Sequence, residues 1–253
     1  MEALSKNTIK LVTSLNRKKE RDEAGLFFAE GPKLVDDLLN TFHCTLLIAT
    51  SDYLSAHKNI KADAVQEVTK EGLKKVSALC APQSVVALFK KPTYQLDYKS
   101  LGSQLSLMLD TVQDPGNLGT IIRIADWFGI ENVICSKETV DVYNPKVVQA
   151  TMGALSRVRV HYLDLEKMLQ DLKGVPVFGT FLEGDDIYEE TLPPSGIIVM
   201  GNEGNGISSN VKKYVDRKLY IPNFPQSRDT SESLNVAVAT AIVCSEFRRR
   251  INR

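Results

Sequence analysis

Asn117 and Arg123 are the first residues of the chain whose types and spacing could do chemistry. They lie in DPGNLGTIIRIADWFG (114–129), where a polar turn ends an apolar run and a helical periodicity begins. At about 100° per residue, Arg123 points away from the apolar stripe of that helix, and Asn117 lies at its mouth. Open α/β sheets keep their sites at such junctions, where an amide and a guanidinium can bind polar groups. Taken alone, the stretch is equally compatible with an ordinary βα loop.

Two later stretches also combine polar residues with a strand end or a helix start. GNEGNGIS (201–208) is rich in glycine and follows a predicted strand, but it matches neither phosphate-binding fingerprint. Its glycines would let the backbone approach a ligand closely, and Glu203 adds one acid. SESLNVA (231–237) places Ser233 and Asn235 at a helix start, where both side chains are favoured simply as caps. Taken singly, each stretch is better explained by a structural role.

The elements that would position these residues alternate between strand and helix, which predicts a parallel sheet. The predicted strands are Leu105–Leu109, Asn132–Lys137, Val175–Leu182, Gly196–Asn202 and Lys218–Asn223. Helices are predicted from Leu118, from Asn144 to about Met152, over Leu165–Leu172 and from Ser233 onward. The last helix is apolar nearly all round, so we expect it to be buried in the core or in a subunit contact.

Residues 1–93 predict a smaller α/β domain. Its predicted strands are 26–31, Thr45–Thr50, Val65–Val68 and Val85–Lys90, and its predicted helices are Ile9–Leu15, one starting at Pro32, Asp52–His57 and Lys70–Ala78. The charged segment NRKKERDEAG (16–25) is predicted to be a turn. We therefore expect an α/β protein with a first domain at 1–93, a linker at 94–103 and a second domain at 104–253.

Composition excludes several classes of protein. A net charge of zero over 253 residues argues against coating nucleic acid by bulk electrostatics, although local basic clusters would suit phosphate contacts. The four cysteines form no CxxC pair and the three histidines stand alone, which favours buried free thiols and no metal site. No apolar run reaches membrane-spanning length and the start has no signal-peptide pattern, so we expect a cytoplasmic protein without membrane contact.

Together, in this order and at this spacing, the three stretches resemble the SpoU (TrmH-like) branch of the SPOUT RNA methyltransferases. The matching motifs are DPGNLGTIIRIADWFG with Asn117 and Arg123, IIVMGNEGNGIS with Glu203, and IP followed by SLNVAVATAI with Ile221, Ser233 and Asn235. The likeness covers roughly residues 105–247. Residues 1–93 resemble, less specifically, the RNA substrate-binding domain of that family.

The resemblance implies a parallel-sheet SPOUT domain with a deep trefoil knot, formed when the segment after Gly201 threads through the sheet. Such a knot is contrary to the usual rule for chain topology, and it rests on the family likeness alone. The resemblance also implies S-adenosylmethionine as the cofactor, held by loops at Thr180, Gly201, Ile221 and Leu234. It further implies a homodimer whose active site is shared between the subunits.

The reaction implied is methyl transfer to a ribose 2′-hydroxyl of RNA. That hydroxyl is a poor nucleophile at neutral pH, so the enzyme must align it with the sulfonium methyl and remove one proton. Arg123 would activate the hydroxyl, either as the base or, since a guanidinium resists deprotonation, by binding the adjacent phosphate. Asn117, Glu203, Ser233 and Asn235 would orient Arg123 and the ribose.

One segment departs from the family pattern. Between Ile221 and Ser233 the family usually has a shorter segment that contains glycine, whereas PNFPQSRDTSE (222–232) is longer and has none. This loop would lie beside the cofactor, so its length bears on the cofactor contacts.

The separate first domain favours ribosomal RNA over transfer RNA as the substrate, by analogy with the family. Two other functions are compatible with the sequence: a catalytically inactive, knotted RNA-binding or assembly factor, and a generic α/β nucleotide-binding enzyme. The intact Asn117, Arg123, Glu203 and Asn235 disfavour the first, and the missing phosphate fingerprint disfavours the second.

Overall fold

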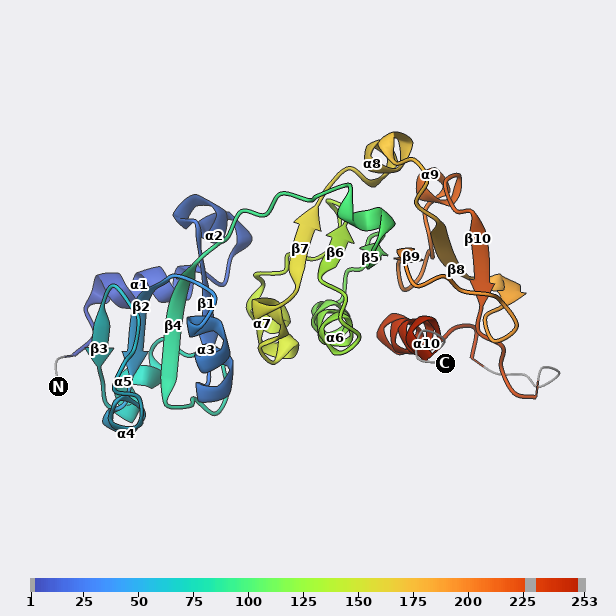
Figure 1. Cartoon of the computed structure of the whole chain (residues 1–253). Helices are drawn as coiled ribbons and strands as arrows, with labels where there is room; N and C mark the ends of the chain where they lie inside the picture. The colour runs from blue at the N-terminus through green and yellow to red at the C-terminus, as the bar shows by residue number, and fades with distance from the viewer. Residues whose placement is uncertain (1–2, 226–230, 250–253) are drawn as a thin grey trace. The chain divides into compact units, whose positions relative to one another are not determined.

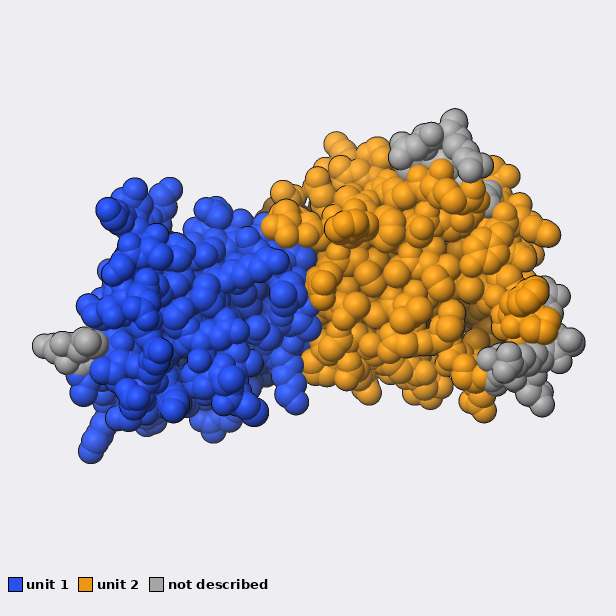
Figure 2. Space-filling model, turned by 90° about the horizontal axis from the view of Figure 1, so that it is seen from below, with its two compact units in different colours: residues 1–93, 141–156 blue, residues 94–140, 157–253 orange. Residues whose placement is uncertain are grey.

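The computed structural model describes residues 3–225 and 231–249. The chain divides into two compact units, shown in different colours in Figure 2. The first unit comprises residues 1–93 and 141–156, and the second comprises 94–140 and 157–253. This division differs from the predicted domains at two places, because 94–103 groups with the second unit and 141–156 groups with the first.

The first unit is built on a four-stranded sheet with the strand order β1-β4-β2-β3 (Figure 1). The strands are β1 (Leu26–Glu30), β2 (Cys44–Ala49), β3 (Val65–Glu67) and β4 (Val85–Lys90). Strands β1 and β2 pair antiparallel with β4, and β3 pairs parallel with β2. The helices are α1 (Lys6–Ser14), α2 (Lys18–Ala24), α3 (Pro32–Leu39), α4 (Ser51–Ala56), α5 (Lys70–Lys74) and α7 (Pro145–Thr151), with a 3-10 turn at Ala154–Ser156. All four predicted strands are present, because apolar runs bounded by turn residues mark buried strands clearly.

Helix α2 corrects the prediction of a turn over 16–25. Arg21, which is 1% exposed, donates from Nη2 to Asp141 Oδ2 at 2.6 Å and from Nη1 to the carbonyl oxygen of Leu15 at 2.7 Å. The helix ends at Gly25, which has the left-handed backbone (φ 64°) that closes many helices. A buried ion pair with a residue far along the chain therefore stabilises a segment whose charges suggested a solvated turn.

Residues 141–156 belong to the first unit through specific packing. The ring centroids of Tyr143 and of Phe27 on β1 lie 4.8 Å apart. Tyr143 follows Asp141, the partner of Arg21, by two residues. Gly153 lies so close to Asp37 that a Cβ at this position would approach Asp37 Oδ2 to 2.1 Å. These contacts come from across the fold, so the helical pattern of the segment predicted α7 but not the unit to which it belongs.

The second unit contains a six-stranded sheet with the order β10-β8-β9-β5-β6-β7, in which every pairing is parallel. The strands are β5 (Leu105–Leu109), β6 (Asn132–Cys135), β7 (Arg159–Tyr162), β8 (Val177–Asp186), β9 (Gly196–Met200) and β10 (Arg217–Tyr220). The helices are α6 (Pro115–Trp127), α8 (Leu165–Asp171), α9 (Ser209–Lys212) and α10 (Val236–Arg249), with a 3-10 turn at Ser100–Gly102. The predicted α/β class and parallel sheet are confirmed. The short helix α9 was not predicted.

Strand β5 lies inside this sheet, between β9 and β6, and all of its side chains are buried. Because strands β5, β9, β8 and β10 are parallel, their carboxyl ends meet at one edge, where α/β sheets place their ligands. Gly201 and Ile221 directly follow β9 and β10, Asn117 lies in the first turn of the helix after β5, and Thr180 lies within β8.

Helices α6 and α10 pack against each other. On α6, Ile121, Ile122 and Ala125 are buried while Arg123 is exposed, as the periodicity predicted. Helix α10 buries most of its apolar residues, but Val238 stays 50% exposed. Within the described residues, no helix is long and apolar enough to cross a membrane.

Candidate active site

Asn117 lies in the first turn of α6, where two distant segments reach it. Asp114 caps the helix by accepting the backbone N–H of Asn117 at 2.7 Å. The Asn117 side chain donates from Nδ2 to Glu203 Oε1 at 3.0 Å, and its Oδ1 accepts from Asn235 Nδ2 at 2.9 Å. The structure thus brings together one polar residue from each of the three sequence stretches.

Glu203 is the acceptor at the centre of this network. Besides Asn117, its carboxylate accepts the backbone N–H groups of Gln113 and Asp114, each at 3.3 Å. Partial burial would raise the pKa of Glu203, but the hydrogen bond from Asn117 and those from the backbone outweigh it and hold the pKa below its ordinary value. Glu203 is therefore ionised at neutral pH and acts as an acceptor, not as an acid.

Asn235 connects the network to α10. Its Oδ1 accepts the backbone N–H of Ala237 at 2.9 Å, so it caps the helix while its Nδ2 reaches Asn117. The oxygen of the Asn235 amide thus makes the helix cap predicted from the sequence. The nitrogen of the same amide makes the contact with the first motif.

Arg123 and Ser233 are not bonded into the network. Both side chains are exposed, and neither makes a hydrogen bond or ion pair with the described part of the chain. Arg123 lies six positions after Asn117, or about 9 Å along the axis at 1.5 Å per residue. Its guanidinium is consequently available to a group from outside the chain.

A cavity of about 650 Å³ opens beside Glu203. The four residues expected to hold the cofactor, Thr180, Gly201, Ile221 and Leu234, all line it, together with Glu203 and Ser233. Thr180 lies within β8, Gly201 and Ile221 directly follow β9 and β10, and Leu234 lies in the segment before α10.

The lining of this cavity fits an adenosine. Its lining combines aliphatic residues such as Leu219 and Ile221 with the glycine-rich segment 200–207, in which little side chain covers the backbone. A Cβ on Gly201 would lie 2.2 Å from the carbonyl carbon of Gly206, so only glycine lets the two backbone segments approach this closely. Gly201 thus allows the two ends of the 201–208 loop to pack against each other.

The sequence did not reveal the residues that hold the 201–208 loop. Asn202 donates from Nδ2 to the carbonyl oxygen of Thr111 at 2.7 Å, and buried Asp110 accepts the backbone N–H of Ser208 at 2.7 Å. Thr111 adopts a left-handed backbone (φ 63°), which is strained for a β-branched residue and common near functional sites. The only signal was a polar residue close to the end of each strand: Asp110 directly follows β5, and Asn202 is the second residue after β9.

Two lysines at the cavity were also not anticipated. The Nζ atoms of Lys212 and Lys218 lie 5.2 Å and 5.8 Å from the ring centroid of Phe181. All three residues line the cavity, so two cations lie over one aromatic ring in the cavity lining.

The thiols contribute no nucleophile to this site. Cys44, Cys135 and Cys244 are buried as predicted, whereas Cys80 is exposed, contrary to the prediction. Burial raises the pKa of Cys44 to about 11 and that of Cys244 to about 12, so both stay protonated at neutral pH. Within the described ranges, no three His, Cys, Asp or Glu residues are grouped so that they could hold a metal ion.

Two family models match the sequence. The model described as the SpoU rRNA Methylase family matches residues 104–245. The model described as the MRM3-like substrate binding domain matches residues 6–87.

Individual proteins are similar over the whole chain. The 23S rRNA (guanosine(2553)-2′-O)-methyltransferase RlmP of Bacillus subtilis is 31% identical, over 98% of this chain and 98% of that protein. A solved structure described as a putative RNA methyltransferase of the TrmH family from Porphyromonas gingivalis is 42% identical, with a TM-score of 0.89 over 98% of this chain and 100% of that one. The AdoMet-bound rRNA methyltransferase from Sinorhizobium meliloti is 28% identical, with a TM-score of 0.85 over 99% and 97% of the two chains.

Proposed function

The chain belongs to the SpoU rRNA methylase family, and from this premise we propose that it transfers the methyl group of S-adenosylmethionine to a ribose 2′-hydroxyl of ribosomal RNA. The observation that carries the proposal is the hydrogen-bonded set Asn117, Glu203 and Asn235 beside a cavity lined by the expected cofactor residues. Relatives whose names specify 23S rRNA 2′-O-methylation support ribosomal RNA as the substrate.

Thr180, Gly201, Ile221 and Leu234 would hold the adenosine part of S-adenosylmethionine. The cofactor, when bound, supplies a methyl group already activated by its sulfonium. The AdoMet-bound rRNA methyltransferase of similar fold supports this choice of cofactor. What the chain must add is alignment of the two reacting atoms and removal of the hydroxyl proton.

We assign Arg123 the activation of the 2′-hydroxyl by electrostatics. Without a partner in the described chain, its guanidinium can bind the phosphate next to the ribose and stabilise the developing oxyanion. Asn117 has one Nδ2–H left after its bond to Glu203, and that donor would orient the ribose. Ser233, at the rim of the cavity, would contact the same substrate region.

The reaction is tested by incubating the purified chain with S-adenosylmethionine labelled in the methyl group and ribosomal RNA lacking this modification. A 2′-O-methyl group blocks alkaline cleavage of the adjacent phosphodiester, so the label should appear in an alkali-resistant dinucleotide. Label in a base would contradict the ribose assignment. Calorimetry that detects no binding of S-adenosylmethionine would favour a catalytically inactive RNA-binding factor.

We also propose the trefoil knot and a homodimer that shares the active site. Membership of the SpoU family supports the knot, and the contacts of Asn202 with Thr111 and of Ser208 with Asp110 are compatible with it, because they place the segment after Gly201 beside the end of β5. The half-exposed Val238 on α10 supports a subunit contact at that helix. An rRNA substrate supports the cytoplasm as the place of the reaction.

A further inference from the structure

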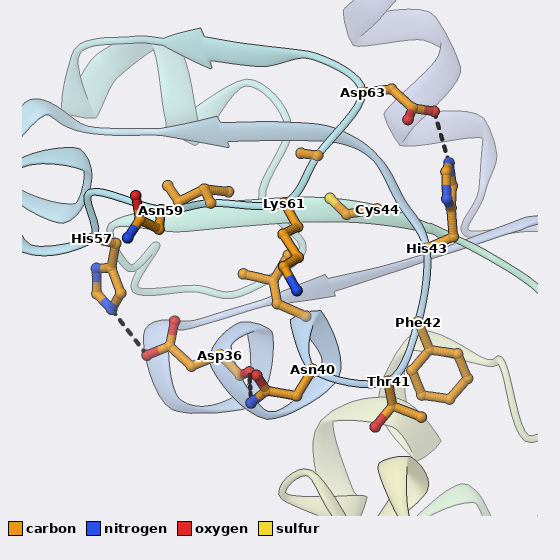
Figure 3. Close-up of a pocket in the computed structure, with 13 residues that line it drawn as sticks. Asp36, Asn40, Thr41, Phe42, His43, Cys44, His57, Asn59, Lys61 and Asp63 are labelled. Atoms are coloured by element: carbon orange, nitrogen blue, oxygen red, sulfur yellow. Dashed lines mark hydrogen bonds and ion pairs between the residues drawn. The ribbon is translucent and has the colours of Figure 1, made fainter.

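A second cavity, of about 790 Å³, lies in the first unit and has no part in the methyl-transfer proposal (Figure 3). It is formed by the C-terminal end of α3, the turn that leads into β2 and the loop 57–63. A cavity of this size is within the range that holds small ligands.

The carboxylates of this cavity already have partners. Asp36 accepts the Tyr53 hydroxyl at 2.6 Å and lies 3.2 Å from His57 Nε2, while Asp63 lies 2.8 Å from His43 Nε2. Asp36 therefore has a partner on each of its oxygens, whereas Asp63 is paired through Oδ2 alone.

The ring of His57 lies between two hydrogen-bond acceptors. Its Nδ1 lies 2.9 Å from the carbonyl oxygen of Tyr53 and its Nε2 faces the Asp36 carboxylate, so both ring nitrogens must donate. The bond to the Tyr53 carbonyl and the charge of Asp36 accordingly raise the pKa of His57 above its ordinary value. The ring also stacks on Tyr53, with centroids 4.1 Å apart.

The groups of the cavity lining that have no partner among the described residues are mainly hydrogen-bond donors. Lys61, Asn59 and the Thr41 hydroxyl make no hydrogen bond with the described residues, although all three line the cavity. Figure 3 shows Lys61 extending from its loop toward the end of α3 that carries Asn40. Asn40 uses one Nδ2–H on the carbonyl oxygen of Asp36 and keeps the other. Lys61 thus offers an unpaired ammonium, and Asn59, Asn40 and Thr41 add amide and hydroxyl donors to the same lining, a combination that suits a phosphate ester.

The lining also includes apolar side chains, which an inorganic anion would not use. Leu39, Ile60 and Ala62 are partly exposed among the polar groups. A flat nucleobase can cover such residues while its edge bonds to amides, as in the recognition of unpaired bases in RNA.

We propose that this cavity binds a nucleotide, with the phosphate on Lys61 and the base against the apolar residues, its edge within reach of Asn59 and Asn40. The nucleotide is either free or an unpaired unit of the RNA substrate. The second source rests on the proposed function, whereas the first does not.

The test uses the full chain and four probes: inorganic phosphate, a mixture of nucleoside monophosphates, each monophosphate alone, and a short unstructured RNA. Affinities are measured by calorimetry, and the ring signals of His43 and His57 are followed by NMR to locate the binding. Lys61→Met removes the charge but keeps the apolar stem. Lys58→Met is the matched control, because Lys58 is an exposed neighbour that does not line the cavity.

We expect Lys61→Met to weaken nucleotide binding by about tenfold or more, the loss typical of one charge-assisted hydrogen bond, while Lys58→Met has little effect. Asn59→Ala, a second variant on the exposed rim, should cause a smaller loss and should change the ranking of the bases. Binding of free monophosphates identifies a free nucleotide as the ligand, and binding of the RNA alone identifies an RNA unit.

Equal affinity of wild type and Lys61→Met for every probe would overturn the proposal. So would binding of inorganic phosphate that matches binding of the nucleotides, because the base would then contribute nothing. Unfolding curves establish that the variants are folded. Binding of S-adenosylmethionine should be unchanged in Lys61→Met, so a failure of this site is distinguishable from a failure of the methyl-transfer proposal.

Discussion

At the scale of single residues, the amide of Asn117 is fixed at both ends. Its nitrogen donates to Glu203 and its oxygen accepts from Asn235, so neither end is free to rotate. Arg123, by contrast, has no partner in the described chain and is exposed. A rigid amide beside an available guanidinium suits a site that aligns one hydroxyl and neutralises its charge.

Arg123→Ala should lower methyl transfer by about 100-fold or more, because it removes the only group assigned to the developing charge. Arg123→Lys should lose less, since it keeps the charge but not the planar fork. Initial rates with labelled cofactor give the effect, and calorimetry should show unchanged binding of S-adenosylmethionine. A rate near wild type for Arg123→Ala would remove this residue from the mechanism.

Glu203 provides a prediction about pH. Its pKa lies below the ordinary 4.5, so the carboxylate should stay ionised from pH 8 down to about 5, and its contribution should be lost only as pH falls through the lowered pKa. Glu203→Gln keeps the shape but not the charge, and should lower the rate by about tenfold with little pH dependence over that range. Rate profiles of the two proteins provide the test. A wild-type loss of activity that begins near pH 6, and that Glu203→Gln abolishes, would contradict the lowered pKa.

At the scale of elements, most strands were predictable, whereas strand β7 and some helices were not. Runs such as Leu105–Leu109 and Val85–Lys90 can be recognised as strands from the sequence alone. A strand that is buried on both faces is apolar at nearly every position, and this pattern is visible within a short window. Helix α2 was missed because its stability depends on Arg21 and Asp141, which are 120 residues apart in the sequence. Patterns within a short window contain no information about such a pair.

Some residues of the candidate site were likewise predictable from the sequence, and others were not. Asn117, Glu203 and Asn235 lie in stretches that a turn, a glycine-rich loop or a cap makes conspicuous. Asn202 and Asp110 were missed because their partners are backbone groups 91 and 98 residues away. Their roles follow from the register of the sheet, which the sequence alone did not determine.

Arg21→Ala tests the ion pair that holds α2 to the segment 141–156. Loss of the guanidinium leaves Asp141 without its cation, and the free energy of unfolding should fall by about 3–5 kcal/mol. Lys18→Ala, on the exposed face of the same helix, should change it by no more than about 0.5 kcal/mol. Denaturant unfolding followed by circular dichroism measures both, and equal effects would show that the pair contributes little.

At the scale of the whole molecule, large apolar side chains are exposed at both ends of the packed helices α6 and α10. Trp127 at the end of α6 is 85% exposed, and Leu234 and Val238 near the start of α10 are 48% and 50% exposed. Large apolar side chains left exposed on neighbouring elements often mark an interface, which supports the proposed homodimer.

Val238→Glu should therefore shift the protein from dimer toward monomer in light scattering and lower methyl transfer with it, because the proposed site is shared. Val65→Glu is a matched control, since Val65 is 47% exposed but lies on β3 of the other unit. If the wild type is monomeric at the assay concentration and fully active, the shared site is wrong.

The membership of residues 141–156 in the first unit has a consequence for any attempt to divide this protein. The chain passes between the units at 93/94, 140/141 and 156/157, so neither unit is a single continuous fragment. A truncated protein that ends at residue 93 would lack Asp141, Tyr143 and Gly153, and would expose the surfaces of Arg21, Phe27 and Asp37 that they cover. Exchange of the first 93 residues for those of a relative would also pair a foreign surface with the native α7. The gene can therefore be cut or recombined cleanly only if this internal segment moves together with the N-terminal part.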